Sequence, residues 1–330
     1  MRRTDPLFGP LLLTLCLLLG GPLQAAPLEI KFAHVVAEDT PKGQMALRFK
    51  ELVQQRLGGR VQVSVYPDAS LYGDNEVIDA MLAGDVQIAA PSLSKFTRYT
   101  KALQVFDLPF LFRDMAAVER FQASPQGRRL LGALKLKGIV GHGYLHNGMK
   151  QLSATKPLRL PGDAAGVSFR IQNSAVLQAQ FEAVQARAVK QPFSEVYRLL
   201  QQRQIDGQEN TWSNIRFKRF YEVQPYITES NHGVLDYLVV TSAEFWLGLD
   251  RNLRQQLQQA LQEAIAYGNQ LAARTAAADR QAVLDAGSSQ LISLSEAEYR
   301  AWSAAMQPVW QQFASDIGSE VIAAAQAANR

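Results

Sequence analysis

The chain has 330 residues, more than most single hydrophobic cores hold, so two lobes are expected. Apolar residues make up 47% and charged residues 19%, as in ordinary globular proteins. The net charge of +4 is spread thinly, with no basic run of the kind that nucleic-acid-binding arms carry. This excludes a nucleic-acid partner and is compatible with an anionic small molecule.

The N-terminus reads as a signal segment, residues 1–25. A basic start at residues 2–3 precedes the apolar run Leu11–Leu19, and we expect cleavage between Ala25 and Ala26. The apolar run is too short for a permanent membrane anchor. Cys16 is the only cysteine and would leave with the signal, so we expect a periplasmic protein without disulfide, thiol nucleophile or cysteine metal site.

The first part of the mature chain alternates between strand and helix. The predicted elements are strand 28–34, helix 41–57, strand 61–65, helix 74–84 and strand 86–90. Asp74 is predicted to cap the second helix. This order predicts a largely parallel sheet, whose ligands sit at the carboxyl ends of the strands. His34 and Ser92 fall at such ends.

The next part contains packing elements and a crossover. The apolar stretch 106–112 is predicted to pack in a core, and 116–134 to form a helix interrupted near Pro125. A glycine-rich strand follows at 138–144. Asn147-Gly148 is predicted to be a turn that presents Lys150, and residues 156–161 to cross into the second lobe.

Residues 166–214 organise the second lobe. The alternation in 167–172 predicts a half-buried strand with Arg170 on its polar side. Two helical segments follow, and Gly207 ends the second one shortly before Glu209 and Asn210. Arginine at one strand end and an amide after a second strand–helix unit can converge on a small anion. The alternative is an arginine paired with a surface acid, and spacing alone favours that alternative.

The remaining chain is mostly helical. Residues 233–241 form an apolar strand that returns to the first lobe. A long helix is predicted from Ala243 to about Ala286, where Gly287 stops it, and residues 295–328 are also helical.

No motif predicts catalysis. His142 and His146 have the spacing of a helical metal pair, but the glycines around them favour a strand, which separates the two rings by about 13 Å. Nucleotide-binding and hydrolase motifs are absent from the sequence. Glu209 beside Asn210 could be a general base, yet nothing marks a nucleophile or a paired acid. We therefore expect no metal, no cofactor and no enzyme activity.

A family resemblance sharpens this interpretation. Segments such as FAHVVAEDTPKG, GDVQIAAPSLSKF, QVFDLPFLF, FRIQNS and PFSEVYRLLQQRQIDGQEN follow one another along nearly the whole mature chain. Together they resemble the substrate-binding proteins of TRAP transporters, and within them the C4-dicarboxylate-binding (DctP) type. The serial occurrence of RIQ, FSEVY and DGQEN is highly specific.

The resemblance implies roles for individual residues. Arg170 in FRIQ matches the arginine that grips a substrate carboxylate, Asn210 the amide of DGQEN, and Phe193 an aromatic that packs on the ligand. Lys150 matches a second charged position, and Asn173 a contact position. Six further residues fall near the cleft by position: His34, Lys42, Ser92, Lys95, Asn214 and Tyr237. For the two lysines among these six, an ordinary solvated role is an equal alternative.

The resemblance also implies an architecture and partners. It implies a two-lobed α/β clamp with mixed sheets and a long helix through both lobes. Lobe I would comprise 26–147 plus 236–275, and lobe II 148–235 plus 276–330. Such a protein captures succinate, fumarate or malate in the periplasm as a monomer and delivers it to the small and large membrane subunits. A clamp for another organic acid, such as a 2-oxo or sugar acid, and a periplasmic enzyme or sensor-domain ligand carrier remain alternatives.

Overall fold

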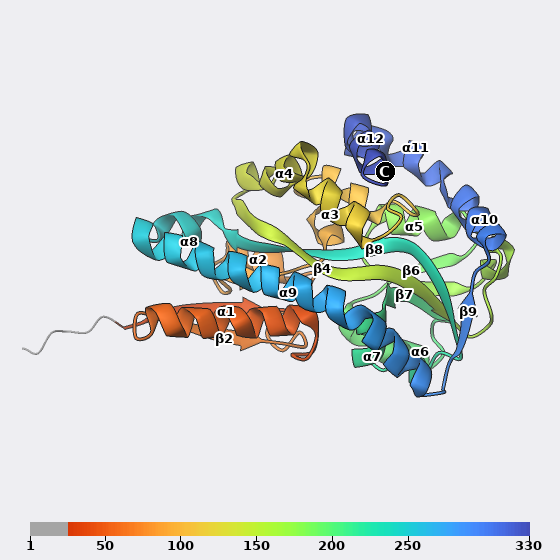
Figure 1. Ribbon diagram of the computed structural model, residues 1–330, viewed down its shortest axis with the longest axis horizontal. Coiled ribbons are helices and arrows are strands. Elements are labelled where there is room, and N and C mark those ends of the chain that lie inside the picture. The colour runs from red at the N-terminus through yellow and green to blue at the C-terminus, as the bar shows by residue number, and fades with distance from the viewer. Residues whose placement is uncertain (1–25) are drawn as a thin grey trace, which may run out of the picture.

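A mixed sheet forms the centre of the protein. The structure, a computed structural model, describes residues 26–330, so the predicted signal segment lies outside the described residues. Nine strands of this part join one sheet in the order β2-β1-β3-β8-β4-β7-β5-β6, and β9 pairs with β8 outside that path. Helices lie on both sides of the long strands (Figure 1).

Strands β4 and β8 belong to both halves of the molecule. β4 spans Ile139–Ala154 and runs antiparallel to β8, Tyr226–Ser242. β3 joins one end of β8 through the pair Ala89 and Val240, whereas β7 pairs with the opposite end of β4, Lys150–Ala154. Two groups of strands are thus attached to opposite ends of the same two strands. This confirms the predicted two-lobed α/β architecture.

The first group of strands is parallel, as predicted. Its elements are β1 (Leu28–Ala33), α1 (Pro41–Leu57), β2 (Val61–Tyr66), α2 (Val77–Leu82) and β3 (Ile88–Ala89). The side chain of Thr40 accepts a hydrogen bond from Gly43 N, and so caps α1. Met45 and Phe49 are fully buried on the face of α1 that packs on the sheet. The predicted cap of α2 is wrong: Glu76 precedes that helix without a side-chain cap, and Asp74 lies outside it.

The predicted turn at Asn147-Gly148 is also wrong. β4 continues through both residues, and its pairing with β8 skips one residue between His146 and Gly148. Gly148 has φ of +143°, which a residue with a side chain rarely adopts. Asn-Gly favours a turn where a strand can end, but here β7 and β8 pair with β4 on both sides. The irregularity therefore becomes a bulge within the strand.

The second group holds the stretch from 166 to 214. Its elements are β5 (Ser168–Ile171), α5 (Ala175–Glu182), β6 (Arg187–Lys190), α6 (Val196–Gln201), β7 (Gly207–Thr211) and α7 (Trp212–Phe217). β5 lies between β6 and β7, and all four of its residues are buried. The half-buried strand predicted around Arg170 is therefore wrong, since its polar face lines the interior of the molecule. β6 has no counterpart in the predicted elements.

One long helix crosses the molecule. α9 spans Arg251–Asp285, and Figure 1 shows it running from the side of α8 to the side of α6. The predicted helix from Ala243 is in fact divided, because α8 ends at Gly248 and Asp250 caps α9 by accepting from Leu253 N. Gly268 permits close packing: a Cβ there would lie 2.8 Å from Met45.

The other helices cover the ends and the far face. They are α3 (Met115–Ala123), α4 (Pro125–Gly132), α8 (Ala243–Gly248), α10 (Glu296–Met306), α11 (Pro308–Ile317) and α12 (Ser319–Ala327), with β9 (Gln290–Ser293) before α10. The break between α3 and α4 before Pro125 confirms the predicted interruption. Trp302 packs in the core beneath β5, whereas Phe313 packs with Phe106 and Phe121 of the first half. The C-terminal helices thus contact both halves, and the lobe boundaries stay a prediction.

Candidate functional site

A cleft between the two groups of strands collects most of the predicted binding residues. Seven of the eleven line it: Ser92, Lys150, Arg170, Phe193, Asn210, Asn214 and Tyr237. The cavity left between the side chains is small, about 20 Å³. We call Val35, Asp74, Ser92 and Tyr237 the first wall, and Lys150, Arg170, Phe193, Glu209 and Asn210 the second wall.

Arg170 contributes a buried cation to the second wall. Its side chain rises from β5, and the residue is only 3% exposed. Its Nε donates to the carbonyl oxygen of Gln191 over 2.9 Å, and its guanidinium lies 5.8 Å from the centre of the Phe193 ring. Burial lowers the Arg170 pKa to about 10, although the Glu209 and Asp74 carboxylates oppose this. No described carboxylate pairs with it within 4.0 Å, so its outer donors remain available to an anion.

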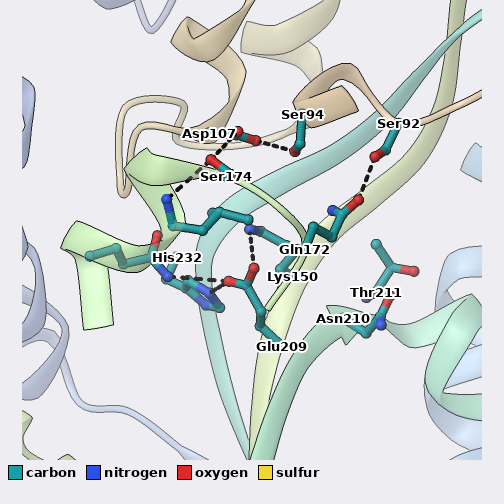
Figure 2. A network of polar contacts seen from close by, with 12 residues as sticks. Ser92, Ser94, Asp107, Lys150, Gln172, Ser174, Glu209, Asn210, Thr211 and His232 are labelled. Atoms are coloured by element: carbon teal, nitrogen blue, oxygen red, sulfur yellow. Dashed lines mark hydrogen bonds and ion pairs between the residues drawn. The ribbon is translucent and has the colours of Figure 1, made fainter. Parts of the chain in front are cut away.

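Lys150, by contrast, is fully compensated within the protein (Figure 2). Its Nζ donates to Glu209 Oε1 over 2.9 Å, and Glu209 Oε2 lies 2.8 Å from His232 Nε2. Gln180 Nε2 donates to the same carboxylate. Burial opposes ionisation, but Lys150 and His232 outweigh it and lower the Glu209 pKa to about 2. The charge of Lys150 is therefore matched before any ligand arrives.

Lys42 is a second buried cation without an acidic partner. It lies in the first turn of α1 and is 1% exposed, so the alternative of an ordinary solvated lysine is wrong. Nζ donates to the Ala90 carbonyl over 3.1 Å and lies 3.5 Å from the centre of the Tyr237 ring. Burial lowers the Lys42 pKa to about 8, while Asp74 opposes this. Within the described chain no carboxylate comes within 4.0 Å of it.

His34 lies beside Lys42 and is buried with it. Both ring nitrogens lack a hydrogen-bond partner among the described residues. Burial, with Lys42 as a further cause, lowers the His34 pKa to about 3, so the ring is neutral at physiological pH. Neither His34 nor Lys42 is among the side chains that line the cavity itself. Both lie behind the first wall.

Amide and hydroxyl groups fix the remaining side chains of the cleft. Asn214 Nδ2 donates to Asn210 Oδ1 over 2.7 Å, and Asn147 Nδ2 donates to the Tyr237 hydroxyl over 2.5 Å. Ser92 donates to Gln172 across the cleft, as Figure 2 shows. This bond joins the first wall to the residue that follows β5, so the two sides of the cleft meet in this conformation.

Two predicted residues lie elsewhere. Asn173 and Lys95 line a neighbouring groove of about 330 Å³, together with Asp74, which borders both spaces. Lys95 Nζ donates to Asn75 Oδ1 over 2.8 Å. The structure therefore does not bring these two predicted residues into the cleft.

Three polar residues of the cleft were not among those predicted to bind: Asp74, Gln172 and Glu209. The sequence did contain a signal for Gln172. It lies two residues after Arg170, and residues two apart along an extended chain point to the same side. For Asp74 no periodicity could help, since it lies in a loop. Glu209 was noted only as a possible base, and its ion pair with Lys150 depends on two strands distant in sequence.

The histidine pair of β4 has structural partners. His142 contacts Gln258 and Thr241, and His146 Nδ1 lies 2.8 Å from Asp236 Oδ2. Within residues 26–330, no three histidine, cysteine, aspartate or glutamate side chains are grouped so as to hold a metal. A helix both long and apolar enough to cross a membrane is also not found in this range.

Comparisons with known proteins place the chain in a family. Residues 32–316 match the family described as "Bacterial extracellular solute-binding protein, family 7". The chain belongs to this family. A Shewanella loihica protein named C4-dicarboxylate-binding periplasmic protein DctP is 60% identical over 94% of each chain.

Solved structures of family members share the fold. A TRAP periplasmic solute-binding protein from Shewanella oneidensis, with bound succinate, is 60% identical and superposes with a TM-score of 0.92 over 92% of this chain and all of that one. One from Pseudomonas aeruginosa, with bound L-malate, is 48% identical, with a TM-score of 0.84 over 87% of this chain and all of that one. Family membership confirms the predicted resemblance.

Proposed function

We propose that this protein binds C4-dicarboxylates such as succinate, fumarate and L-malate for a TRAP transporter. One observation carries the proposal: two buried cations have no acidic partner, Arg170 in the second wall and Lys42 directly behind the first wall. A four-carbon dianion has one charge for each. The relatives that bind succinate and L-malate support the same ligand class.

The arrangement favours a dianion because a buried charge is costly until it is paired. The pKa values of Arg170 and Lys42 are both lowered by burial, so each cation gains from an incoming carboxylate. A planar guanidinium can take one carboxylate through two parallel hydrogen bonds, and the ammonium acts as a point charge for the other. A monoacid or a neutral analogue leaves at least one cation unpaired.

Lys150 then has a different role from the one the resemblance suggests. Because Glu209 already matches its charge, we assign the second carboxylate to Lys42 and the support of the second wall to Lys150. Phe193, Asn210 and Asn214 would enclose the carbon chain and any hydroxyl group. Asp74 in the first wall would disfavour a third carboxylate.

Closure of the cleft would complete the site. The cavity of about 20 Å³ has room for about one water, which needs roughly 10–15 Å³ of such space, and is far too small for a four-carbon diacid. Any dicarboxylate must therefore enter an open form, and the walls then close around it. We propose the periplasm as the place of capture and the two TRAP membrane subunits as the recipients. In this function the protein leaves its ligand chemically unchanged.

Calorimetric titration with a panel of acids tests the proposal. We expect succinate, fumarate and L-malate to bind at least 100-fold more tightly than butyrate, which carries one charge on a chain of the same length. D-galactonate and 2-oxobutanoate represent the alternative ligand classes. If either acid bound more tightly than every C4-dicarboxylate, we would conclude that the protein binds that class of acid instead.

A further inference from the structure

A second cavity lies behind the cleft, on the other side of the central strands. It has a volume of about 180 Å³. Alternation along β4 separates the two spaces: Lys150 lines the cleft, while its neighbours Met149 and Gln151 line the second cavity. In β7, Asn210 likewise lines the cleft and Thr211 lines the second cavity. We call this space the rear cavity.

The rear cavity lies where the long elements pass between the two halves. Gly148 lines it at the bulge of β4, and Asn231 lines it where β8 has a residue with φ of +44°. The pairing of β4 with β8 is irregular at both places. Ala272 and Ala276 of α9 close the remaining side. Irregular strand positions absorb a change in backbone angles more readily than regular ladder positions, so this is the hinge of the proposed clamp.

Two buried polar atoms in the rear cavity have no hydrogen-bond partner within the described chain. They are Ser213 Oγ and Asp279 Oδ2, on residues that are 4% and 1% exposed. Thr275, one turn earlier on α9, acts to lower the Asp279 pKa, but it makes no well-formed hydrogen bond to Oδ2. A buried oxygen without a partner is unfavourable, so an occupant that donates a hydrogen bond is favoured.

The surroundings restrict the chemistry of that occupant. Asp279 Oδ1 already accepts from Arg216 Nη1 over 2.6 Å, so a further cation would meet the guanidinium. An anion would meet the carboxylate. Apolar atoms of Met115, Met149 and Trp212 line the rest of the wall. A neutral molecule with a hydroxyl donor and a short apolar body fits both parts. A cavity of roughly 150 Å³ holds a molecule of the size of benzene, so the volume of about 180 Å³ limits the occupant to a small molecule.

Hydrogen bonds connect the rear cavity to the cleft. Asn147 lines the cavity, accepts from Thr211 Oγ1 over 3.0 Å and donates to the Tyr237 hydroxyl in the first wall. Thr211 Oγ1 in turn accepts from Asn214 N at the start of α7, and Asn214 lines the cleft. Because the two spaces lie on opposite sides of the same strands, closing the cleft widens the rear cavity. An occupant that fills the widened cavity therefore favours the closed form.

We propose that the rear cavity is a second binding site, for a small neutral alcohol or polyol, whose occupation strengthens dicarboxylate binding in the cleft. This inference rests on the proposed function, because closure is the motion that couples the two spaces. Ser213 and Asp279 would hold the hydroxyl groups, and Asn147 would transmit the coupling.

Succinate titrations in increasing 1,2-propanediol test this inference. We expect the succinate Kd of the wild type to fall several-fold, and the effect to be lost in Ser213→Ala, which removes one hydroxyl partner. A general solvent effect would persist in that variant and would overturn the proposal. So would a succinate Kd that stays constant at every diol concentration, since the cavity would then hold water only.

A pair of helix variants separates the coupling from the folding of the chain. Ala276→Leu fills the mouth of the rear cavity from the exposed side of α9, and should tighten succinate binding without diol and make it insensitive to diol. Ala273→Leu, an exposed position of α9 outside the cavity, should behave as the wild type. Equal behaviour of the two variants would contradict the coupling. Failure of the wild type to bind succinate would instead refute the proposed function.

Discussion

The two sides of the cleft differ in how their buried lysines are neutralised. On the second wall, Lys150 is bonded to Glu209, whose other carboxylate oxygen is bonded to His232, and only Arg170 is left without an acid. On the side of the first wall, Lys42 is held by a carbonyl and an aromatic ring alone. Lining the cleft therefore does not make a cation available to a ligand. One available cation on each side means that a dianion gains fully only when the sides come together.

Among the changes in ligand binding, we expect the greatest loss from replacing Arg170. Arg170→Lys keeps the charge but loses the planar pair of donors, so we expect succinate binding to weaken by about 2 kcal/mol or more, which is roughly 30-fold. Calorimetry on the folded variant measures this. Binding at the affinity of the wild type would show that Arg170 has only a structural role.

Replacing the two lysines separates their roles. Lys42→Met removes the proposed second cation, so succinate binding should weaken by about 1.5–3 kcal/mol, while butyrate binding changes much less. Thermal stability should stay constant or rise, because burial disfavours the charged form of Lys42. Lys150→Met should instead lower the melting temperature, since it leaves the buried Glu209 carboxylate without its lysine and with only the contacts to His232 and Gln180, a loss of up to about 3–5 kcal/mol.

Lys95→Met is the matched control, because Lys95 lies in the neighbouring groove rather than in the cleft. It should leave succinate affinity and melting temperature nearly unchanged. If Lys150→Met selectively weakened succinate and kept its stability, Lys150 rather than Lys42 would be the second cation. Equal losses of affinity for succinate and butyrate in Lys42→Met would mean that Lys42 contributes to the electrostatic potential of the whole cleft and does not bind the second carboxylate.

The ionisation of Lys42 makes both stability and ligand binding depend on pH. The folded pKa of Lys42 is lowered from 10.5 to about 8, whereas Arg170, with a pKa of about 10, stays charged over most of this range. Between pH 8 and 10.5 the unfolded chain binds more protons at Lys42, so the stability of the ligand-free protein should rise with pH in that window. Succinate affinity should fall as the pH rises through the folded pKa of about 8, by roughly tenfold from pH 7 to pH 9, as Lys42 loses its charge.

Both trends depend on one side chain, so Lys42→Met should flatten them. Titrations and thermal unfolding at pH 7, 8 and 9 provide the measurement. A constant succinate affinity across this range in the wild type would contradict the assignment of Lys42.

The sequence predicts the groups of strands well because periodicity is local. The alternation in 28–34 and the apolar stripe of α1 are complete within their own segments, and both elements form as expected. The bulge at Asn147-Gly148 could not be predicted, because it depends on β7 and β8 pairing with β4 from both sides. Whether a lysine is available to a ligand also depends on residues distant in sequence. Lys42 bonds to the Ala90 carbonyl and Lys150 to Glu209, and neither partner is near its lysine in the sequence.

The smallest expected effect concerns the rim of the cleft. Lys218 Nζ, just after α7, lies 2.6 Å from Asp68 Oδ1 in the loop after β2, so this ion pair joins the two sides. Asp68 and Ala69 both have positive φ, and their N–H groups donate to the carbonyls of Val36 and His34 behind the first wall. The loop is thus fixed where it meets Lys218. The pair itself is partly solvated, which limits its value to about 0–1 kcal/mol.

Asp68→Asn removes the charge while retaining a residue that tolerates positive φ. We expect succinate to dissociate about two- to threefold faster at low ionic strength, because the pair exists only when the sides are together. The difference from the wild type should shrink strongly in 1 M salt, where a Debye length of about 3 Å screens the attraction as soon as the two side chains begin to separate. Stopped-flow displacement measures the dissociation rate. An effect that persists in 1 M salt would mean that Asp68 acts through the conformation of its loop, and the rim would then contribute to closure by shape rather than by charge.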